Sequence, residues 1–289
     1  MSAIDGLKSK TIFNDVTIYN EDCCTLMREM IKKNIKVNLT VTSPPYDDLR
    51  SYDGVGDAWN FDKFKEIANL LYDITSDGGT VVWVVGDACV KGGETLTSFK
   101  QALYFKDIGF TCHDTMIYEK NSSSFPARRD GKRYTQIFEY MFVFTKGKIK
   151  TGHLICDRKN KWFGFTNWGS NTQYEKDGTM KTTKDIKPVP EFSPRTNIWK
   201  YTTGFNINVG KHSAVFPYKL AEDHTLSWSD EGDIIFDPFS GSGTVASAAI
   251  NNKRKFIGSE IVEQYFNDSF TNIEMYVERK TKEDKKNAG

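Results

Sequence analysis

Hydrophobic and polar positions along the first third of the chain predict strands that alternate with helices. Residues 15–20, 37–42 and 80–88 are typical of strands, and the last run is apolar at nearly every position, as in a parallel sheet covered on both faces. Apolar residues over 61–74 recur at helical spacing, and the glycine pair at 78–79 is expected to end that helix. This alternation predicts an open, mostly parallel α/β sheet, which binds ligands beyond the carboxyl ends of its strands.

The same alternation continues along the chain and is interrupted once. The remaining expected elements are a helix near 95–107, strands at 110–120 and 137–147, a helix at 215–228, a strand, glycine-rich turn and helix at 232–252, and a strand at 253–261. Residues 150–205 have no clear period, and a stretch of this length without an evident core favours a functional role. The charged residues at 278–289 are expected to fray.

Composition narrows the class of protein. The 289 residues, 38% of them hydrophobic, are typical of a globular protein with one large domain and room for a smaller one. No apolar run approaches the ~20 residues of a membrane helix, and the first residues lack a signal-peptide core, so we expect a cytoplasmic protein without membrane contact. The five cysteines and four histidines show no metal-ligand spacing, so we expect reduced thiols and no metal.

The net charge of +1 hides a strong segregation of charge. Residues 119–220 hold 19 Lys and Arg against 8 Asp and Glu, a balance of +11, so the rest of the chain carries −10. A basic middle inside an acidic frame indicates a localised surface for a polyanion. A merely solvated basic surface is the alternative that charge alone leaves open.

A glycine-rich turn, "FDPFSGSGT" at 236–244, follows an apolar strand and opens a helix. Gly241 and Gly243 let the backbone turn tightly and approach a ligand without a Cβ in the way. A third glycine and a Gly-Lys-Ser/Thr sequence are both missing, which disfavours a nicotinamide dinucleotide and a P-loop. Glu260 ends the next strand, where a carboxylate can accept hydrogen bonds from ribose hydroxyls. A ligand with a ribose and no phosphate is suggested, and S-adenosylmethionine fits.

A second motif, "TSPPY" at 42–46, follows another predicted strand. Adjacent prolines cannot donate backbone hydrogen bonds or continue a central strand, so they stiffen the chain where that strand ends. Together, "TSPPY" and "FDPFSGSGT" resemble motifs of the amino-methylating DNA methyltransferases that use S-adenosylmethionine. "FIGSEI" at 256–261 resembles the ribose-binding strand of this family, "HSAVFP" at 212–217 the segment before its cofactor loop, and "YNEDC" at 19–23 the strand end that contacts adenine.

The order of the motifs is similar to that of the family's beta group, because the catalytic motif precedes the cofactor loop. The resemblance implies an α/β fold with a circularly permuted, Rossmann-like methyltransferase sheet, mostly parallel, and an inserted target-recognition region. The expected division is a catalytic half at 1–149, a target-recognition region at 150–211, a cofactor-binding half at 212–276 and a charged tail at 277–289. The basic, patternless stretch falls where the group has its recognition region.

The resemblance also implies a role for each motif residue. Ser43 and the carbonyl of Pro44 would accept hydrogen bonds from an exocyclic amino group, Pro45 would help to fix that carbonyl, and Tyr46 would stack on the extruded base. The residues expected to bind S-adenosylmethionine, and its product S-adenosylhomocysteine, are Asp22, Cys23, Phe216, Pro217, Asp237, Pro238, Phe239, Ser240, Gly241, Ser242, Gly243, Thr244, Glu260 and Ile261.

The segment at 122–136, which is rich in Lys and Arg and is called the basic loop below, is expected to contact double-stranded DNA. Its candidate phosphate ligands are Arg128, Arg129, Lys132 and Arg133. A solvated loop is the alternative. Four aromatic residues further on could read or wedge bases, or pack as the core of a small subdomain: Trp162, Phe163, Phe165 and Trp168.

The predicted function is a sequence-specific DNA methyltransferase that acts on N4 of a flipped-out cytosine. In the family, Ser before Pro-Pro-Tyr favours N4 of cytosine, whereas Asp or Asn favours N6 of adenine, so an adenine-N6 enzyme is the alternative. Two other classes stay open: a DNA-binding module without catalysis, and a nicotinamide oxidoreductase. A homodimer and a cognate restriction endonuclease are further partners that the resemblance allows, in the cytoplasm of a bacterium or encoded by a phage.

Overall fold

The computed structural model describes residues 4, 6–13, 15–45, 59–121, 132, 134–166, 171–183, 187–202 and 217–287. The chain forms two compact units. The larger comprises Met1–His153 with Asn197–Gly289, and the smaller comprises Leu154–Thr196. No helix in the described ranges is both long enough and apolar enough to cross a membrane.

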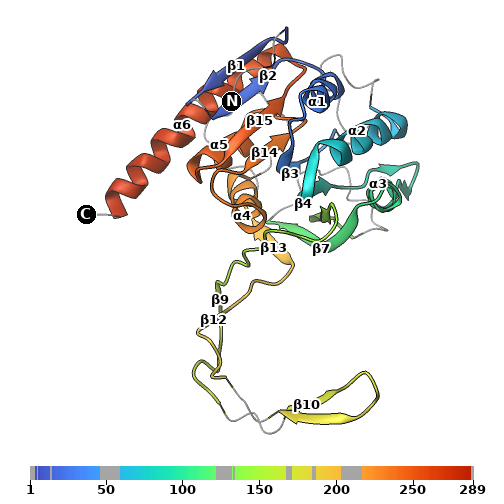
Figure 1. The fold of residues 1–289 in the computed structure, drawn as a ribbon, viewed down its shortest axis with the longest axis vertical. Coiled ribbons are helices and arrows are strands. Elements are labelled where there is room, and N and C mark those ends of the chain that lie inside the picture. The colour runs from blue at the N-terminus through green and yellow to red at the C-terminus, as the bar shows by residue number, and fades with distance from the viewer. Residues whose placement is uncertain are drawn as a thin grey trace. The chain divides into compact units, whose positions relative to one another are not determined.

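The larger unit is built on a nine-stranded sheet (Figure 1). In spatial order the strands are β1 (Ser9–Ile12), β2 (Val16–Tyr19), β15 (Lys255–Ser259), β14 (Ile234–Asp237), β3 (Val37–Thr42), β4 (Thr75–Val85), β8 (Phe138–Thr145), β7 (Thr111–Lys120) and β13 (Ile198–Tyr201). The strands from β2 to β4 are all parallel, and only β1 and β8 run antiparallel to their neighbours. The sheet is therefore open and mostly parallel, as the alternation of elements predicts.

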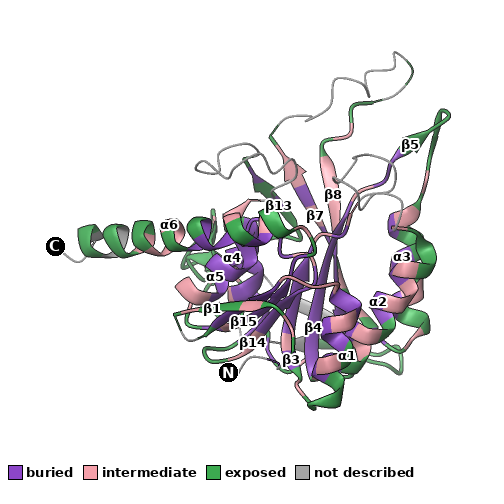
Figure 2. Cartoon of the chain, turned by 90° about the horizontal axis from the view of Figure 1, so that it is seen from above, coloured by how far each residue is buried: buried purple, intermediate pink, exposed green. Residues whose placement is uncertain are grey.

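Helices cover both faces of this sheet (Figure 2). On one face lie α1 (Cys23–Lys32), α2 (Phe61–Ile74) and α3 (Thr97–Asp107), and on the other lie α4 (Tyr218–Trp228), α5 (Thr244–Asn251) and α6 (Glu263–Asn287). On the first face the aromatic rings of Phe64, Trp83 and Phe105 meet edge to face, with centroids 5.2–5.7 Å apart. All three side chains are fully buried. Burial on both faces explains why the central strands are apolar at nearly every position.

The glycine pair at 78–79 does not end a helix, contrary to the expectation from sequence. Helix α2 ends at Ile74, and β4 starts at once with Thr75, whose hydroxyl donates to the carbonyl of Leu71. The glycines form an irregularity inside β4, where the pairing with β3 shifts its register. Gly78 has φ +79°, and a Cβ on Gly79 would lie 2.9 Å from the carbonyl oxygen of Ser76, so the bend needs glycine at both positions.

Two further segments differ from the patterns in the sequence. The charged end of the chain is helical, because α6 continues to Asn287 rather than fraying early. Strand β13 comes from the stretch without a period, yet it pairs in parallel with β7 at the edge of the main sheet. Its alternating burial, with Trp199 and Tyr201 inside, is too short to stand out in the sequence.

The smaller unit is held by short antiparallel pairs. Strand β9 (Arg158–Lys159) pairs with β12 (Phe192–Ser193), and β10 (Asn171–Tyr174) pairs with β11 (Met180–Thr183). In the larger unit, β5 (Cys89–Val90) and β6 (Gly93–Glu94) form a similar small hairpin. The expected recognition region at 150–211 thus includes the whole smaller unit and β13; its role, like the other predicted boundaries, stays a prediction.

Candidate active site

The carboxyl ends of four neighbouring parallel strands bring the sequence motifs together. Asp22 follows β2, Glu260 follows β15, Asp237 ends β14 and Ser43 follows β3. These strands are adjacent and parallel, so their carboxyl ends share one edge of the sheet. The four motifs are therefore assembled where open α/β sheets bind their ligands.

A buried hydrogen bond ties the "TSPPY" motif to the glycine-rich turn at 236–244, which we call the cofactor loop after its expected role. The hydroxyl of Thr42 donates to Oδ1 of Asp237 over 2.7 Å, and the backbone N–H of Phe239 donates to the same oxygen over 3.0 Å. Burial raises the pKa of the Asp237 carboxyl to about 7, against the opposing effect of these hydrogen bonds. Ser43 and Pro44 continue directly from Thr42, with Ser43 half-buried and Pro44 buried. The end of β3 is thus fixed against the start of the cofactor loop.

The cofactor loop is a tight turn that runs straight into α5. Gly241 and Gly243 have φ of +49° and +80°, in the left-handed region that favours glycine. The N–H of Gly243 donates to the carbonyl of Ser240 over 2.8 Å, and α5 begins at Thr244. A Cβ on Gly243 would lie 2.9 Å from Cγ1 of Ile273 on α6. The second glycine is therefore required by packing as well as by conformation.

Glu260 links the cofactor loop to the end of β15. Its Oε2 accepts from the N–H of Gly241 and its Oε1 from the N–H of Val262, both over 2.8 Å. Only 7% of the residue is exposed, and burial raises the pKa of the carboxyl. Each carboxylate oxygen has a second lone pair, so both can accept a ribose hydroxyl in addition to the backbone donors.

Asp22 has a structural function beside the expected one. Its Oδ1 accepts from the N–H groups of Cys24 and Thr25, over 3.0 and 3.2 Å, and so caps the start of α1. Its Oδ2 lies 3.3 Å from Nζ of Lys63.

The thiols of Cys23 and Cys24 lie at the start of the same helix. The hydrogen bond between these two thiols raises the pKa of Cys23 and lowers that of Cys24. The sulfur atoms of these two thiols and a carboxylate oxygen of Asp22 lie within 4.8 Å of one another, the one such group in the described ranges, and the ammonium of Lys63 forms an ion pair with that carboxylate.

Two observations test whether the loop fits S-adenosylmethionine. The hydroxyl of Ser240 is buried without a hydrogen-bond partner, which is a costly arrangement unless a ligand atom completes it. A Cβ on Gly258 would lie 2.6 Å from Cε1 of Phe256 and 2.9 Å from that hydroxyl. The backbone of β15 therefore lies so close to the cofactor loop that a side chain does not fit at position 258. A ribose held by Glu260 and a polar group at Ser240 fit these residues.

The structure describes the remaining predicted residues in less detail, and some of them not at all. Pro238 is buried at the start of the loop, Pro217 caps α4, Ile261 is half exposed beside Glu260, and Lys132 is exposed. The buried members of the loop further include Ser242, whose carbonyl accepts from the amide of Asn272 over 3.3 Å. Six predicted residues lie outside the described ranges: Tyr46, Arg128, Arg129, Arg133, Trp168 and Phe216.

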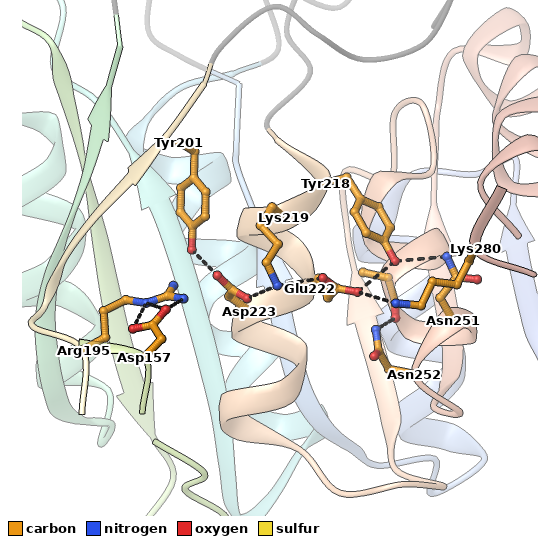
Figure 3. A network of polar contacts seen from close by, with 11 residues as sticks. Asp157, Arg195, Tyr201, Tyr218, Lys219, Glu222, Asp223, Asn251, Asn252 and Lys280 are labelled. Carbon is orange, nitrogen blue, oxygen red and sulfur yellow. Dashed lines mark hydrogen bonds and ion pairs between the residues drawn. The ribbon is translucent and has the colours of Figure 1, made fainter. Parts of the chain in front are cut away.

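A polar network on α4 is absent from the expectations drawn from the sequence (Figure 3). Lys219 reaches both Asp223 and Glu222, with Nζ 2.7 and 2.9 Å from their carboxylate oxygens. Tyr201 of β13 donates to the other oxygen of Asp223 over 2.7 Å, and Asn251 of α5 donates to the hydroxyl of Tyr218. The network ties α4 to β13 and α5 beside Pro217. The spacing of Lys219 to the two acids, three and four residues, is the signal that could have found it.

Two tryptophan side chains contact the cofactor loop at Phe239. The ring of Phe239 lies 5.6 Å from that of Trp59 and 6.4 Å from that of Trp83, both edge to face. These contacts fix the loop residue that follows Pro238. The sequence marks Phe239 only as part of the motif, and neither tryptophan carries a local signal.

Comparisons with known proteins agree with this geometry. The family model described as DNA methylase (N6_N4_Mtase) matches residues 37–271. The chain is 50% identical over 255 residues to the orphan methyltransferase M.BamHII of Bacillus amyloliquefaciens, covering 86% of this chain and 93% of the relative. It is 26% identical to the DNA adenine methyltransferase YhdJ of Escherichia coli K12, covering 79% and 73%.

Solved structures share the fold. The PvuII DNA methyltransferase, described as cytosine-N4-specific, has a TM-score of 0.66 at 18% identity, covering 95% of each chain. The complex of M1.HpyAVI with S-adenosylmethionine has a TM-score of 0.60 at 22% identity, covering 89% of this chain and 98% of that one. The predicted fold class and cofactor are thereby confirmed. The chain belongs to the N6/N4 DNA methylase family, the S-adenosylmethionine-dependent enzymes that methylate amino groups of DNA bases.

Proposed function

We propose that this enzyme methylates N4 of a cytosine at a specific site in double-stranded DNA. The observation that carries the proposal is the buried bond between Thr42 and Asp237, which holds Ser43 beside the cofactor loop. Serine before Pro-Pro supports cytosine over adenine. Adenine N6 is the second candidate, because the relative YhdJ is named as an adenine methyltransferase.

The catalytic problem is a weakly nucleophilic nitrogen. The lone pair of an exocyclic amino group is delocalised into the base ring. Oγ of Ser43 and the carbonyl oxygen of Pro44 would each accept one N–H of that group, which draws the nitrogen toward a tetrahedral shape and frees the lone pair. Pro44 and Pro45 have φ locked by their rings, so the carbonyl is oriented before the base arrives.

The bound cofactor supplies an electrophilic methyl group on a sulfonium sulfur. The lone pair of the amino nitrogen would form a bond to this methyl carbon while the carbon–sulfur bond breaks and its electron pair stays on sulfur, and the nitrogen would then lose a proton to water. Glu260 and the loop at Ser240 would hold the nucleoside and amino-acid ends of the cofactor. Tyr46 would offer a ring for the extruded base, whose stacking is worth about 1–3 kcal/mol.

The experiment is nucleoside mass spectrometry of DNA from cells that express the chain. We expect N4-methylcytosine, and much less of it from a Ser43→Ala variant. Thr281→Ala, which removes an exposed hydroxyl on α6, is the matched control and should methylate normally. N6-methyladenine would overturn the assignment of the base. Unmodified DNA from a chain that binds S-adenosylmethionine would favour a DNA-binding module, and sequencing of modified sites would give the recognition sequence.

The setting of the enzyme is part of the proposal. Relatives from Bacillus amyloliquefaciens and Escherichia coli support a bacterial or phage-encoded enzyme that acts on DNA in the cytoplasm. A cognate endonuclease and a homodimer remain predictions.

A further inference from the structure

A short turn in the smaller unit exposes three aromatic rings between basic residues. The segment "RKNKWFGF" at 158–165 holds three cations, three aromatic residues and no acid. The exposed fractions are 57% for Trp162, 64% for Phe163 and 41% for Phe165. These rings therefore do not form a buried core of the unit, which was the alternative that the sequence left open.

Backbone hydrogen bonds hold this turn on both sides. The N–H of Asn160 donates to the carbonyl of Glu191, and that of Gly164 to the carbonyl of Val189, over 2.8 and 2.9 Å. Val189 donates back to the carbonyl of Phe165 over 3.1 Å. Gly164 has φ +78°, a conformation that a side chain at this position would strain. The rings are thus presented from an ordered backbone, which lowers the entropy lost on binding.

The three rings differ in their contacts within the turn and in their exposure. The centroids of Trp162 and Phe165 lie 5.9 Å apart with the planes tilted by 51°, so Phe165 braces Trp162 from within the turn. Phe163 is the most exposed of the three. Phe163 and Trp162 are therefore the two rings of the turn with the largest fraction exposed to solvent, and Phe165 positions Trp162.

The charge around the turn indicates which partner this is. Arg158, Lys159 and Lys161 are exposed, and no ion pair within the described part of the chain involves them. Asp157, the acid next in sequence, is paired with Arg195. A group of exposed apolar rings is typical of a binding surface, and the cations beside them favour an anionic partner. Nucleic acid combines both properties.

We infer that Trp162 and Phe163 stack on bases of the bound DNA, while Lys159 and Lys161 contact its phosphates. The sugar–phosphate backbone is polar and charged, so base faces are the large apolar surface that DNA offers to an aromatic ring. Insertion at a base step costs a few kcal/mol of unstacking, and ring stacking offsets that cost. The inference rests on the proposed function, because it takes DNA as the substrate.

The test compares a Trp162→Ala, Phe163→Ala double variant with the parent on a short duplex that carries the mapped methylation site. We expect the double variant to bind at least about 10-fold more weakly, with the salt dependence of binding unchanged. Tyr174→Ala removes a ring that is 76% exposed, more than either Trp162 or Phe163, from β10 of the same unit and is the matched control. It should bind like the parent.

Two further arms separate stacking from charge and from self-association. A Lys159→Ala, Lys161→Ala variant should reduce the slope of log affinity against log salt by roughly 0.9 for each phosphate that the protein no longer neutralises. An abasic site beside the target should tighten binding by the parent, because it leaves room for a ring, and should not tighten binding by the aromatic variant.

Unchanged DNA binding by the folded aromatic variant, checked by circular dichroism and by its affinity for S-adenosylmethionine, would overturn the inference. The inference would also be overturned if sedimentation showed that the same variant had lost a dimer while its DNA affinity was unchanged. The aromatic rings would then contact a second copy of the chain and not DNA. Failure of the parent to methylate DNA would instead overturn the proposed function. The two failures are therefore distinguishable.

Discussion

Replacing the buried carboxyl of Asp237 with an amide should stabilise the protein in a pH-dependent way. Burial raises the pKa of this carboxyl to about 7 in the folded chain, from 3.8 for an exposed one. Well below pH 3.8 the carboxyl is protonated in both the folded and the unfolded state, so it does not lower the free energy of unfolding. As pH rises from 4 to 7 the unfolded state loses its proton first, so stability falls across this window and stays low above it.

The magnitude follows from the difference in pKa. About three pKa units correspond to a free-energy cost of about 4 kcal/mol at pH 8, and of about 2 kcal/mol at pH 5. The side-chain amide of an Asp237→Asn variant keeps an oxygen that can accept from both Thr42 and Phe239, although its NH₂ group must find acceptors at a cost of about 1–3 kcal/mol. The stabilisation by Asp237→Asn should therefore be greater at pH 8 than at pH 5 by about 2–3 kcal/mol, whatever the constant cost of the amide.

Urea unfolding of the ligand-free protein at pH 5 and pH 8 measures this difference. Asp62→Asn, which changes a carboxylate with an 85% exposed side chain on α2, is the control and should alter the free energy of unfolding by less than about 0.5 kcal/mol at either pH. An equal effect of Asp237→Asn at the two pH values would refute the reasoning, because the carboxyl would then have an ordinary pKa in the folded chain.

Three more predictions concern the site itself. Ser43→Ala should greatly slow single-turnover methyl transfer with little change in the dissociation constants of cofactor and DNA, and normal turnover would contradict the proposed mechanism. Gly258→Ala should weaken S-adenosylmethionine binding in calorimetry and lower stability by about 1–3 kcal/mol, since its Cβ would meet Phe256 and the Ser240 hydroxyl. Neutralising the four cations of the basic loop should weaken binding to all DNA sequences and flatten its salt dependence without affecting cofactor affinity, whereas an unchanged slope would make the loop merely solvated.

The sequence by itself determined most of the strands of the main sheet, the motifs at their ends and the family. Short windows suffice for this, because a strand buried on both faces must be apolar throughout and a tight turn needs glycine or proline at fixed positions. "TSPPY" and "FDPFSGSGT" carry their chemistry locally, so the resemblance could be stated from 42–46 and 236–244 alone. The shared edge followed from the rule that parallel strands end on the same side.

Predictions from short stretches of sequence were wrong for features that depend on residues far away in the chain. The glycines at 78–79 have the composition of a helix end, yet Asn38 of β3 and Lys146, directly after β8, make them a bulge inside β4. Strand β13 has four residues and no periodic signal, and it exists because the edge of β7 accepts it in parallel. Wherever a partner strand supplies the hydrogen bonds, the conformation of a segment is set outside that segment.

Tertiary structure alone decided how the site is held and which side chains face outward. Thr42 and Asp237 are 195 residues apart, and only the adjacency of β3 and β14 brings the hydroxyl to the buried carboxyl and shifts its pKa. The exposure of Trp162 and Phe163 likewise depends on what packs over them, which no local pattern records. Side-chain identity fixes what a residue can do, whereas burial and contact, which set its pKa and its availability, arise only when the whole chain has folded.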